Sequence, residues 1–401
     1  MNKKKIRILY IHHGGAKGGA PRSLAFLINN IDKSLYEPYV VVGMDYEENK
    51  KLFESVGANV IYKKYIGAWH GSTVAKVSFN TFLYNLKHCI PTYFRMFSVL
   101  KEVNPDIVHL NSTCLFLAAK AVKKYNSNIP IVCHVREQLL PGFWGDILRN
   151  NVNNYVDRFI AIEKYDAQTL KTSKKTDIIY NFIDFKTYNE NIKSNILRKE
   201  LNINENEKIL LYLARISPGN GAYEMLISLE NFIKKNKDIH ICLVGAEYEI
   251  MCDYLKKVLN FSEKNKNVHV LPFRNDVPNI IASSDLLIAP FTEPHFARSV
   301  IEAAAMGVPS IVSNVGGLDE LVVDKKTGVI YNTQNHGELE EKIKEIINDE
   351  AMLKQLSKNA IEYAHKNFDS KINSNRTFKV YEELLKKRVT NYEPNQKKFN
   401  I

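Results

Sequence analysis

The chain has 401 residues, of which 45% are hydrophobic and 25% charged, and its formal net charge is +11. This length allows two domains with separate cores, and the composition is typical of a soluble globular protein. No apolar run approaches the ~20 residues of a membrane-spanning helix, so the sequence excludes a protein built on such helices.

The N-terminus combines a basic start with a short apolar run. Residues 6–11 (IRILYI) are too few for the hydrophobic region of a signal peptide, so they predict a first strand. The five cysteines form no C-x-x-C pair, which favours reduced thiols in a cytoplasmic protein. After the strand, residues 12–23 (HHGGAKGGAPRS) allow a tight turn, and Pro21 fits the first position of a helix.

Positive charge is concentrated in the first half of the chain, where residues 1–190 carry 26 Lys and Arg against 16 Asp and Glu. Residues 62–101 contain no acidic residue and interleave basic with aromatic side chains. This pattern fits peripheral contact with an anionic membrane surface. Ordinary core aromatics in a lysine-rich protein would give the same pattern. Nucleic-acid binding is the weakest interpretation, and we expect no nucleic-acid partner.

The apolar run at residues 129–135 ends with a histidine. His134 lies at the expected carboxyl end of a strand, where ligands bind in open α/β sheets. The segment that follows, 138–150 (QLLPGFWGDILRN), places large apolar residues around a Pro-Gly pair. It either contacts a lipid acceptor or packs under a neighbouring helix.

Short apolar runs separated by helical patterns indicate two doubly wound parallel sheets, and hence an α/β fold. A polar, Asn-rich stretch separates the two series of runs and predicts a linker at 186–205. We expect domains at 1–185 and 206–370, followed by a helix and polar tail at 371–401. The runs are 6–11, 38–43, 58–62, 106–110, 129–135, 157–162 and 176–181, then 208–214, 239–245, 268–273, 285–290 and 309–314.

Residues 285–332 are the richest stretch for chemistry. The strand at 285–290 leads through a loop with Glu293 into a helix from about Arg298, which carries Glu302. Backbone N–H groups at such a helix N-terminus suit an anion, and the two carboxylates can accept hydrogen bonds from sugar hydroxyls.

A second strand in this stretch, residues 310–313, opens into Gly316-Gly317. We expect another helix to follow, carrying Glu320. A diglycine at such a turn lets the backbone approach a phosphate closely.

Together these residues resemble the family 4 retaining glycosyltransferases of GT-B fold. Their pattern is E-x7-E-A, then G-x-P-V, then G-G-x-x-E, and the similarity extends over most of the chain. Further matching pieces are YLARIS (212–217), LVGA (243–246) and RNDVPNIIASSDLLIAP (274–290). The resemblance implies a two-domain GT-B enzyme whose C-terminal helix returns to the N-terminal domain.

In that family the first Glu of the pair contacts the donor sugar and the second binds the ribose hydroxyls. The resemblance carries these roles to Glu293 and Glu302, although eight residues separate them here rather than seven. A one-residue insertion at His295 would account for the difference, and the loop would bulge.

The family's diphosphate ligands are an Arg and a Lys in the loop after the first strand of the C-terminal domain. Arg215 matches, but Asn220 stands where the Lys is expected. We expect Arg298 to substitute in part, and Lys17 to be a further cation near the diphosphate. Gly316 and Gly317 would supply amides to the same group.

The resemblance also implies roles for residues in the N-terminal half. His134 matches the cleft histidine that reaches the donor sugar. The amides near Gly15, Gly18 and Gly19 would face the diphosphate or an anionic acceptor. In the C-terminal half, Arg274 lies in a loop that could touch the nucleotide base.

The sequence thus predicts a retaining hexosyltransferase that moves a sugar from a nucleoside diphosphate sugar, the donor substrate, to a glycan or lipid-linked glycan. Capsule or O-antigen synthesis at the inner face of the plasma membrane would fit. No Asp-x-Asp pair occurs and the histidines show no ligand spacing, so we expect no metal and no cofactor.

Three alternatives stay open. One is a glycosyltransferase-like binding or assembly protein without turnover, which Asn220 and the altered Glu spacing would explain. Another is a GT-B sugar-nucleotide epimerase, which needs no acceptor. The third is a dehydrogenase, but residues 14–19 lack the G-x-G-x-x-G spacing.

Overall fold

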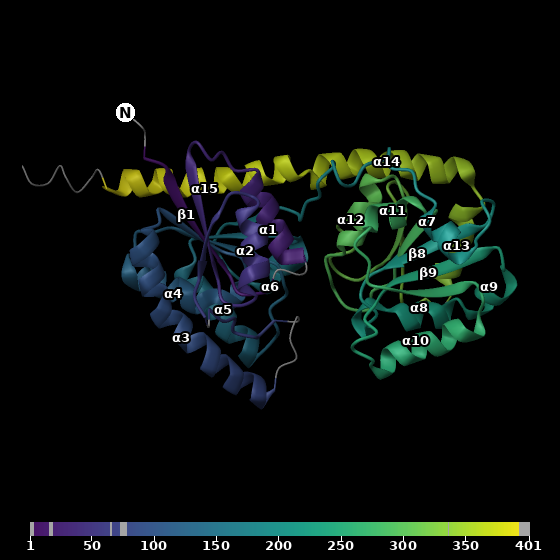
Figure 1. Ribbon diagram of the computed structural model, residues 1–401, viewed down its shortest axis with the longest axis horizontal. Helices are drawn as coiled ribbons and strands as arrows, with labels where there is room; N and C mark the ends of the chain where they lie inside the picture. Colours follow the sequence, from purple (N-terminus) through teal and green to yellow (C-terminus); the bar gives the residue numbers. More distant parts are fainter. Residues whose placement is uncertain (1–3, 16–18, 65, 73–77, 336, 393–401) are drawn as a thin grey trace, which may run out of the picture. The chain divides into compact units, whose positions relative to one another are not determined.

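The computed structural model describes residues 4–15, 19–64, 66–72, 78–335 and 337–392, with side chains to residue 388 in the last helix (Figure 1). By its internal contacts the chain divides into two compact units. Unit 1 comprises residues 1–181 and 370–401, and unit 2 comprises residues 182–369. The C-terminal helix α15 therefore belongs with the N-terminal half of the chain, as the resemblance implied.

Unit 1 contains a seven-stranded parallel sheet in the order β3-β2-β1-β4-β5-β6-β7. The strands are β1 (Ile6–His12), β2 (Tyr36–Val42), β3 (Asn59–Tyr62), β4 (Ile107–Leu110), β5 (Ile131–Val135), β6 (Arg158–Ala161) and β7 (Thr176–Ile178). The helices are α1 (Gly19–Asn29), α2 (Tyr46–Glu54), α3 (Phe79–Val103), η1 (Thr113–Leu115), α4 (Phe116–Tyr125), α5 (Phe143–Tyr155), α6 (Lys164–Thr169) and α15 (Ser370–Tyr392).

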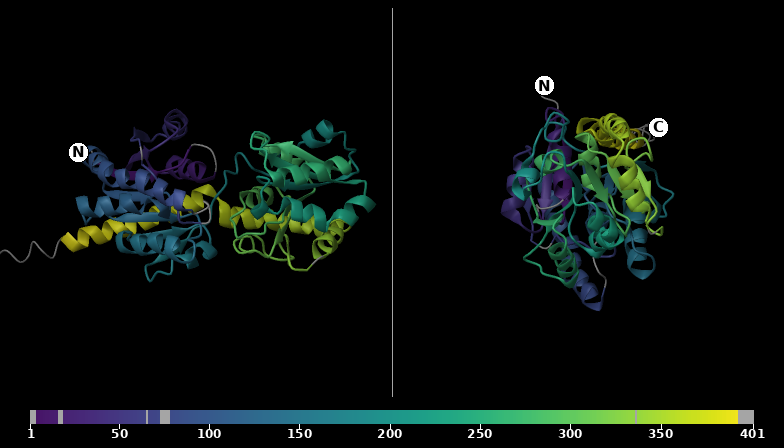
Figure 2. Two further views of the ribbon diagram at one scale, coloured as in Figure 1. Left: turned by 90° about the horizontal axis from the view of Figure 1, so that it is seen from below. Right: turned by 90° about the vertical axis from the view of Figure 1, so that its right-hand side faces the viewer.

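Every residue of the central strands β4, β5 and β6 is buried, which is why their sequences are mostly apolar without alternation, apart from His109, His134 and Arg158. Leu9, Ile11 and Cys133 point to the face covered by α3, α4 and α5. His109 and His134 point to the other face, where α15 supplies Tyr381. Figures 1 and 2 show these helices layered on the sheet of unit 1.

Unit 2 contains a six-stranded parallel sheet in the order β10-β9-β8-β11-β12-β13. Its strands are β8 (Lys208–Leu213), β9 (Ile239–Ala246), β10 (Val268–Pro272), β11 (Leu286–Ala289), β12 (Ser310–Ser313) and β13 (Val329–Tyr331). Its helices are α7 (Ile196–Leu201), η2 (Pro218–Asn220), α8 (Ala222–Ser228), α9 (Glu230–Lys235), α10 (Asp253–Lys264), α11 (Val277–Ala282), α12 (Arg298–Ala305), α13 (Glu338–Ile347) and α14 (Glu350–Phe368).

The prediction of two doubly wound parallel sheets is confirmed, and each of the expected apolar runs contains a strand. Strand β13 was not expected. The segment at 186–205, expected to be a linker, instead belongs to unit 2, because its helix α7 buries Leu197 and pairs Arg198 with Asp285 at 3.0 Å.

Two local expectations differ from the structure. Helix α1 begins at Gly19, so Pro21 is its third residue rather than its first. Proline is tolerated there because the N–H groups of the first helical turn have no acceptor inside the helix. The helix expected after Gly317 is wrong: residues 316–321 form turns. Among the described residues, no helix is both long and apolar enough to cross a membrane.

Candidate active site

In unit 2, the loops that follow three neighbouring strands are tied together at the carboxyl edge of the sheet. The backbone N–H of Thr292, after β11, donates to the carbonyl of Gly219, after β8, at 3.0 Å. The N–H of His295 donates to the carbonyl of Gly316, after β12, at 3.2 Å. This edge is where ligands bind in open α/β sheets, so the loops form one candidate site.

Glu293 lies in the middle of this loop cluster, and its side chain is exposed. Its carboxylate packs against Gly219, where a Cβ atom would come within 2.7 Å of Glu293 Oε2. A side chain at position 219 would displace the Glu293 carboxylate from this position. Residues 292–297 are irregular and lead into α12, so the extra residue of the Glu-x8-Glu spacing is accommodated before the helix begins.

Glu302 is buried on α12, with 8% of its surface exposed. Its Oε1 lies 3.4 Å from Nε of Arg298, one helical turn earlier. Arg298 also donates from Nη2 to the carbonyl of Phe182 at 3.4 Å. The ion pair with Arg298 orients this buried carboxylate, whose oxygens can accept hydrogen bonds from a ligand.

Arg215 is the more exposed cation of the cluster, with 69% of its side chain accessible. Its Nε lies 3.2 Å from Oε1 of Glu247, which follows β9. Asn220 does not face outward as a ligand group: its Nδ2 donates to the Arg215 carbonyl at 2.8 Å, as does the hydroxyl of Tyr212. Asn220 therefore fixes the loop that presents Arg215.

The Gly316-Gly317 turn is shaped by its second glycine. Gly317 has φ +93°, a left-handed conformation that favours glycine. Its N–H donates to Oδ1 of Asp319 at 3.2 Å. Because this side chain bonds back to the turn, the segment does not continue as a helix, and Asp319 holds an amide that we expected to meet a phosphate.

Arg274 is held in a network of carboxylates. Its guanidinium donates to both carboxylate oxygens of Asp276, at 2.8 and 2.7 Å, and to Glu200 of α7 at 2.7 Å. Hydrogen bonds from these two carboxylates, Asp276 first, raise the pKa of Arg274. The side chain thus braces its loop against α7, and contact with a base stays a prediction.

The glycine loop of unit 1 is described in part, because Lys17 and Gly18 lie outside the described residues. Gly15 packs so closely on Asp45 that a Cβ would lie 2.2 Å from Asp45 Oδ2. The Asp45 carboxylate would repel an anion bound beside Gly15. Gly19 is the first residue of α1. Anion binding by this loop stays a prediction.

His134 is 4% exposed and belongs to a buried hydrogen-bonded chain. Its Nδ1 lies 2.6 Å from Nε2 of His109, whose Nδ1 lies 2.5 Å from the hydroxyl of Tyr381. Burial lowers the pKa of His134 well below its usual value and that of His109 to about 3, so both rings are neutral at pH 7. With Tyr381 as donor to His109, the His134 proton lies on Nε2, and His134 becomes a hydrogen-bond donor.

A second buried hydrogen-bonded chain lies in unit 1, and the sequence did not reveal its pairings. Asn111, after β4, contacts Nδ1 of His12 through its Nδ2 at 3.1 Å and accepts from Nε of Arg136 at 3.0 Å. Arg136 Nη1 donates to Oδ1 of Asn181 at 3.0 Å. The available signal was that His12, Asn111 and Arg136 each follow or end a predicted strand, so their side chains meet at one edge.

Next to this chain, Glu137 collects hydroxyl donors. Its Oε1 accepts from Ser112 Oγ at 2.5 Å and from Thr113 Oγ1 at 3.0 Å. The carboxyl edge of the unit 1 sheet therefore presents a cation, Arg136, and a carboxylate on adjacent residues.

Replacing Tyr381 by phenylalanine is expected to lower the free energy of unfolding by about 1–3 kcal/mol, because the buried Nδ1 of His109 loses its donor. Tyr125→Phe, which removes the hydroxyl of a partly exposed tyrosine on α4, should change it by less than about 0.5 kcal/mol. Urea unfolding of both variants checks this expectation. Equal urea midpoints for the two variants would show that the Tyr381–His109 hydrogen bond does not contribute to the free energy of unfolding.

Two families match successive parts of the chain. The family described as Glycosyltransferase Family 4 matches residues 17–187, and that described as Glycosyl transferases group 1 matches residues 193–363. The two matches do not overlap, and they leave only the ends and a short join uncovered. The chain is a family 4 glycosyltransferase of GT-B fold.

Relatives of this glycosyltransferase support the same family. The N,N'-diacetylbacillosaminyl-diphospho-undecaprenol alpha-1,3-N-acetylgalactosaminyltransferase of Campylobacter jejuni is 27% identical, with 95% of this chain and 100% of the relative covered. The N-acetyl-alpha-D-glucosaminyl L-malate synthase of Bacillus anthracis is 24% identical, over 73% of this chain and 78% of the relative. Crystal structures of Anabaena HepE in complex with UDP share the fold, with a TM-score of 0.77, 22% identity, and coverage of 94% and 100%.

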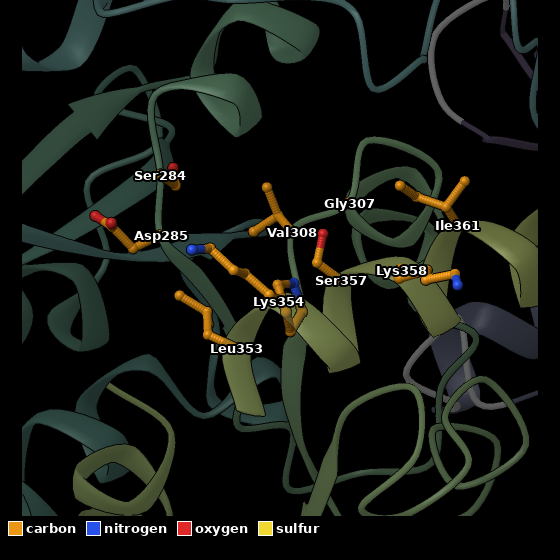
Figure 3. Close-up of a pocket in the computed structure, with 10 residues that line it drawn as sticks. Ser284, Asp285, Gly307, Val308, Leu353, Lys354, Ser357, Lys358 and Ile361 are labelled. Atoms are coloured by element: carbon orange, nitrogen blue, oxygen red, sulfur yellow. The ribbon is translucent and has the colours of Figure 1, made fainter. Parts of the chain in front are cut away.

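One pocket of the glycosyltransferase lies elsewhere in unit 2. It has a volume of about 450 Å³ and is lined by Asp285, Pro309, Lys354 and Lys358, among others (Figure 3). These residues come from the amino ends of β11 and β12 and from α14. It is therefore at the edge opposite the candidate site. Among the described residues, no group of three or more His, Cys, Asp or Glu side chains could hold a metal ion.

Proposed function

We propose that this glycosyltransferase is a retaining, metal-independent hexosyltransferase that moves a sugar from a nucleoside diphosphate to a hydroxyl of a lipid-linked glycan. The observation that carries the proposal is the cluster of Arg215, Glu293 and Glu302 at the carboxyl edge of the unit 2 sheet. It combines a cation for a diphosphate with carboxylates for sugar hydroxyls.

Electrostatics support a role for this cluster in releasing the diphosphate. The leaving group gains negative charge as the glycosidic bond breaks, and a fixed cation lowers the energy of that transition state. Arg215 is exposed and oriented by Glu247, while its loop is held by Asn220. Arg298 lies on the same edge, but it forms an ion pair with Glu302. It would therefore act on the diphosphate as part of this ion pair and not as a separate cation.

Unit 1 would hold the acceptor. Its excess of positive charge suits an anionic lipid-linked glycan, and the Campylobacter relative is named for a diphospho-undecaprenol acceptor. We place the enzyme at the cytoplasmic face of the plasma membrane, in synthesis of a bacterial surface polysaccharide. In unit 1, His134 would act as a neutral donor to the sugar, and Glu137 would accept from an acceptor hydroxyl.

Arg215→Ala is expected to lower kcat/KM for the donor about 100-fold, because a positioned charge aimed at the leaving group is typically worth 10²–10³ in rate. Lys256→Ala removes an exposed cation paired with Asp253 on α10, in the same unit, and should have little effect. Steady-state kinetics with varied donor check this. An unchanged kcat/KM in Arg215→Ala would show that the arginine has no part in the mechanism.

A thermal-shift screen of nucleoside diphosphates and their sugars, in EDTA, tests the donor side. A ligand present at 100 times its Kd adds about 2.7 kcal/mol to the free energy of unfolding. We expect one base and one sugar to give the largest shift in melting temperature, since the site should contact both. Stabilisation by none of them, or only on adding a divalent metal, would contradict the proposal.

A second candidate, a binding or assembly protein without turnover, is favoured by one observation. Asn220 supplies no charge where the family pattern has a lysine, and the structure uses it to hold the loop. Release of nucleoside diphosphate in the presence of acceptor would exclude this candidate. Conversion of the donor without any acceptor would instead indicate an epimerase.

A further inference from the structure

Helix α3 has two different apolar faces. One face packs into the core of unit 1 through Cys89, Met96, Val99, Leu100 and Val103. The other side of the helix carries an exposed row of large hydrophobic residues, which we call the outer stripe: Phe79, Leu83, Ile90 and Phe94. Their spacings of four, seven and four residues place them along one line of an α-helix.

The outer stripe is strongly exposed. Phe79 is 73% accessible and Phe94 67%, and Leu83 and Ile90 are about half accessible. Soluble proteins rarely leave such side chains in a continuous row, because each exposed apolar group costs free energy in water. The row therefore indicates a partner. Figure 1 shows α3 as an outlying helix of unit 1.

The apolar surface continues from α3 onto the start of α5. Phe82 of α3 contacts the ring of Trp144 with centroids 5.9 Å apart, and Trp144 contacts Phe143 at 5.7 Å. Phe143 is exposed. In the Pro-Gly segment, for which the sequence left lipid contact and packing open, Trp144 packs on α3 and Phe143 faces outward; lipid contact stays a prediction.

The charge along residues 62–101, which include the outer stripe, has one sign. Residues 62–101 contain no acidic side chain, and the exposed Lys87 lies between Leu83 and Ile90. Lys64 is also exposed, and Arg95 donates to its carbonyl, which brings this loop beside α3. The nearest acidic residue along the helix is Glu102, at its far end, where it pairs with Lys63 at 3.5 Å.

We propose that the outer stripe of α3, with Phe143, docks on an anionic lipid surface. Phenylalanine, leucine and isoleucine side chains enter the apolar boundary of a bilayer, while lysine stems reach back to anionic headgroups. A nucleic acid could stack on Phe79 and Phe94, but it would leave the exposed aliphatic side chains of Leu83 and Ile90 without an apolar partner. The surface itself rests on α3, whereas its use for meeting a lipid-linked acceptor rests on the proposed function.

Vesicle flotation of the full chain tests the docking surface with a matched pair of variants. Leu83→Glu/Phe94→Glu alters the stripe. Leu35→Glu/Phe273→Glu makes the same changes at leucine and phenylalanine residues of nearly equal exposure, 53% and 66%, elsewhere on the protein. Both variants change the net charge equally, so general electrostatic attraction is matched.

We expect wild type and the control variant to float with vesicles of phosphatidylcholine and phosphatidylglycerol, less at high salt, and not with phosphatidylcholine alone. The stripe variant should lose at least about 10-fold in apparent affinity. Equal losses in both variants, equal binding to neutral vesicles, or no binding by wild type would overturn the proposal. So would a wild-type dimer in sedimentation that the stripe variant abolishes, which would assign the stripe to a second copy of the chain.

A second readout separates this surface from the proposed function. With a water-soluble acceptor analogue, the stripe variant should release nucleoside diphosphate at the wild-type rate. If neither wild type nor any variant shows transfer, but only the stripe variant loses vesicle binding, the proposed function fails and the docking surface stands. If transfer occurs but flotation does not follow the stripe, the docking surface fails alone.

Discussion

Replacing Glu302 by glutamine is expected to weaken nucleoside diphosphate binding roughly 10- to 150-fold, because hydrogen bonds to a charged group contribute about 1.5–3 kcal/mol. The substitution keeps the shape of the side chain and removes its charge. It also leaves Arg298 without its partner at 3.4 Å. Calorimetric titration with the nucleoside diphosphate that binds most tightly measures the effect.

A deoxy ligand makes this test specific for the ribose. If Glu302 accepts from ribose hydroxyls, the difference between wild type and Glu302→Gln should largely vanish for the 2′,3′-dideoxy nucleotide. Glu341→Gln, an exposed carboxylate on α13, is the matched control and should bind like wild type. Equal weakening for both nucleotides would contradict contact with the ribose and leave a structural role through Arg298.

Lowering the pH from 7 to 5.5 is expected to destabilise unit 1 by at least about 4 kcal/mol, or about 1 kcal/mol for each of four histidines with strongly lowered pKa values. His12, His109 and His134 are almost fully buried. Burial lowers the pKa of His12 to about 4 and those of His13 and His109 to about 3, from 6.5, and it also lowers those of His134 and His70.

The sign follows from proton binding. The unfolded chain binds protons at these histidines below about pH 6.5, whereas the folded chain does not until near pH 4 or below. Stability from these groups is therefore complete above pH 6.5 and is lost as the pH falls toward the folded-state pKa values. Both tryptophans, Trp69 and Trp144, lie in unit 1, so their fluorescence during urea unfolding reports this unit.

Proton uptake supplies the independent check. Unfolding of unit 1 at pH 5.5 should be accompanied by the uptake of about four to five protons, as measured from unfolding enthalpies in buffers of different ionisation enthalpy. Constant or rising stability between pH 7 and 5.5 would contradict the neutral, buried state of these rings.

The sheets were predictable from the sequence because their strands are short and mostly apolar, without alternation. β4, β5 and β11 are buried at every residue, so their pattern survives without knowledge of their neighbours. β13 was missed because it has only three residues, Val329–Tyr331, and is flanked by polar turns. Its place in the sheet depends on pairing with β12, which a local pattern does not reveal.

The local geometry after Gly317 shows where a pattern misleads. The sequence after the diglycine is compatible with a helix, but Asp319 bonds back to the Gly317 N–H. A short side chain that offers the backbone an alternative partner competes with helix formation. Such competition depends on the turn conformation and does not appear in residue spacing.

The sequence indicated which residues lie at the candidate site, but not which side chains they pair with. Arg215, Glu293 and Glu302 each lie where the family pattern and the strand ends indicate. The partners that orient them come from elsewhere in the chain, as with Glu247 on Arg215. The contact between His109 and Tyr381 spans 272 residues, so only the folded unit brings the two side chains together.

The assignment of Asn220 illustrates the same limit. From the sequence, an asparagine in place of lysine indicates a lost cation. In the structure it acts on the backbone, because its side chain donates to the Arg215 carbonyl. The asparagine thus holds the loop, and Arg215 is an exposed charge on it.

Proton NMR of a transfer reaction in EDTA tests the central claim most directly. The reaction contains the enzyme, the nucleotide sugar selected by the thermal-shift screen, and a polyprenyl-diphosphate-linked saccharide. We predict acceptor-dependent release of nucleoside diphosphate and a new anomeric signal whose coupling constant matches the configuration of the donor sugar. A product of opposite anomeric configuration, a strict requirement for a divalent metal, or loss of donor without any glycosylated acceptor would contradict the account.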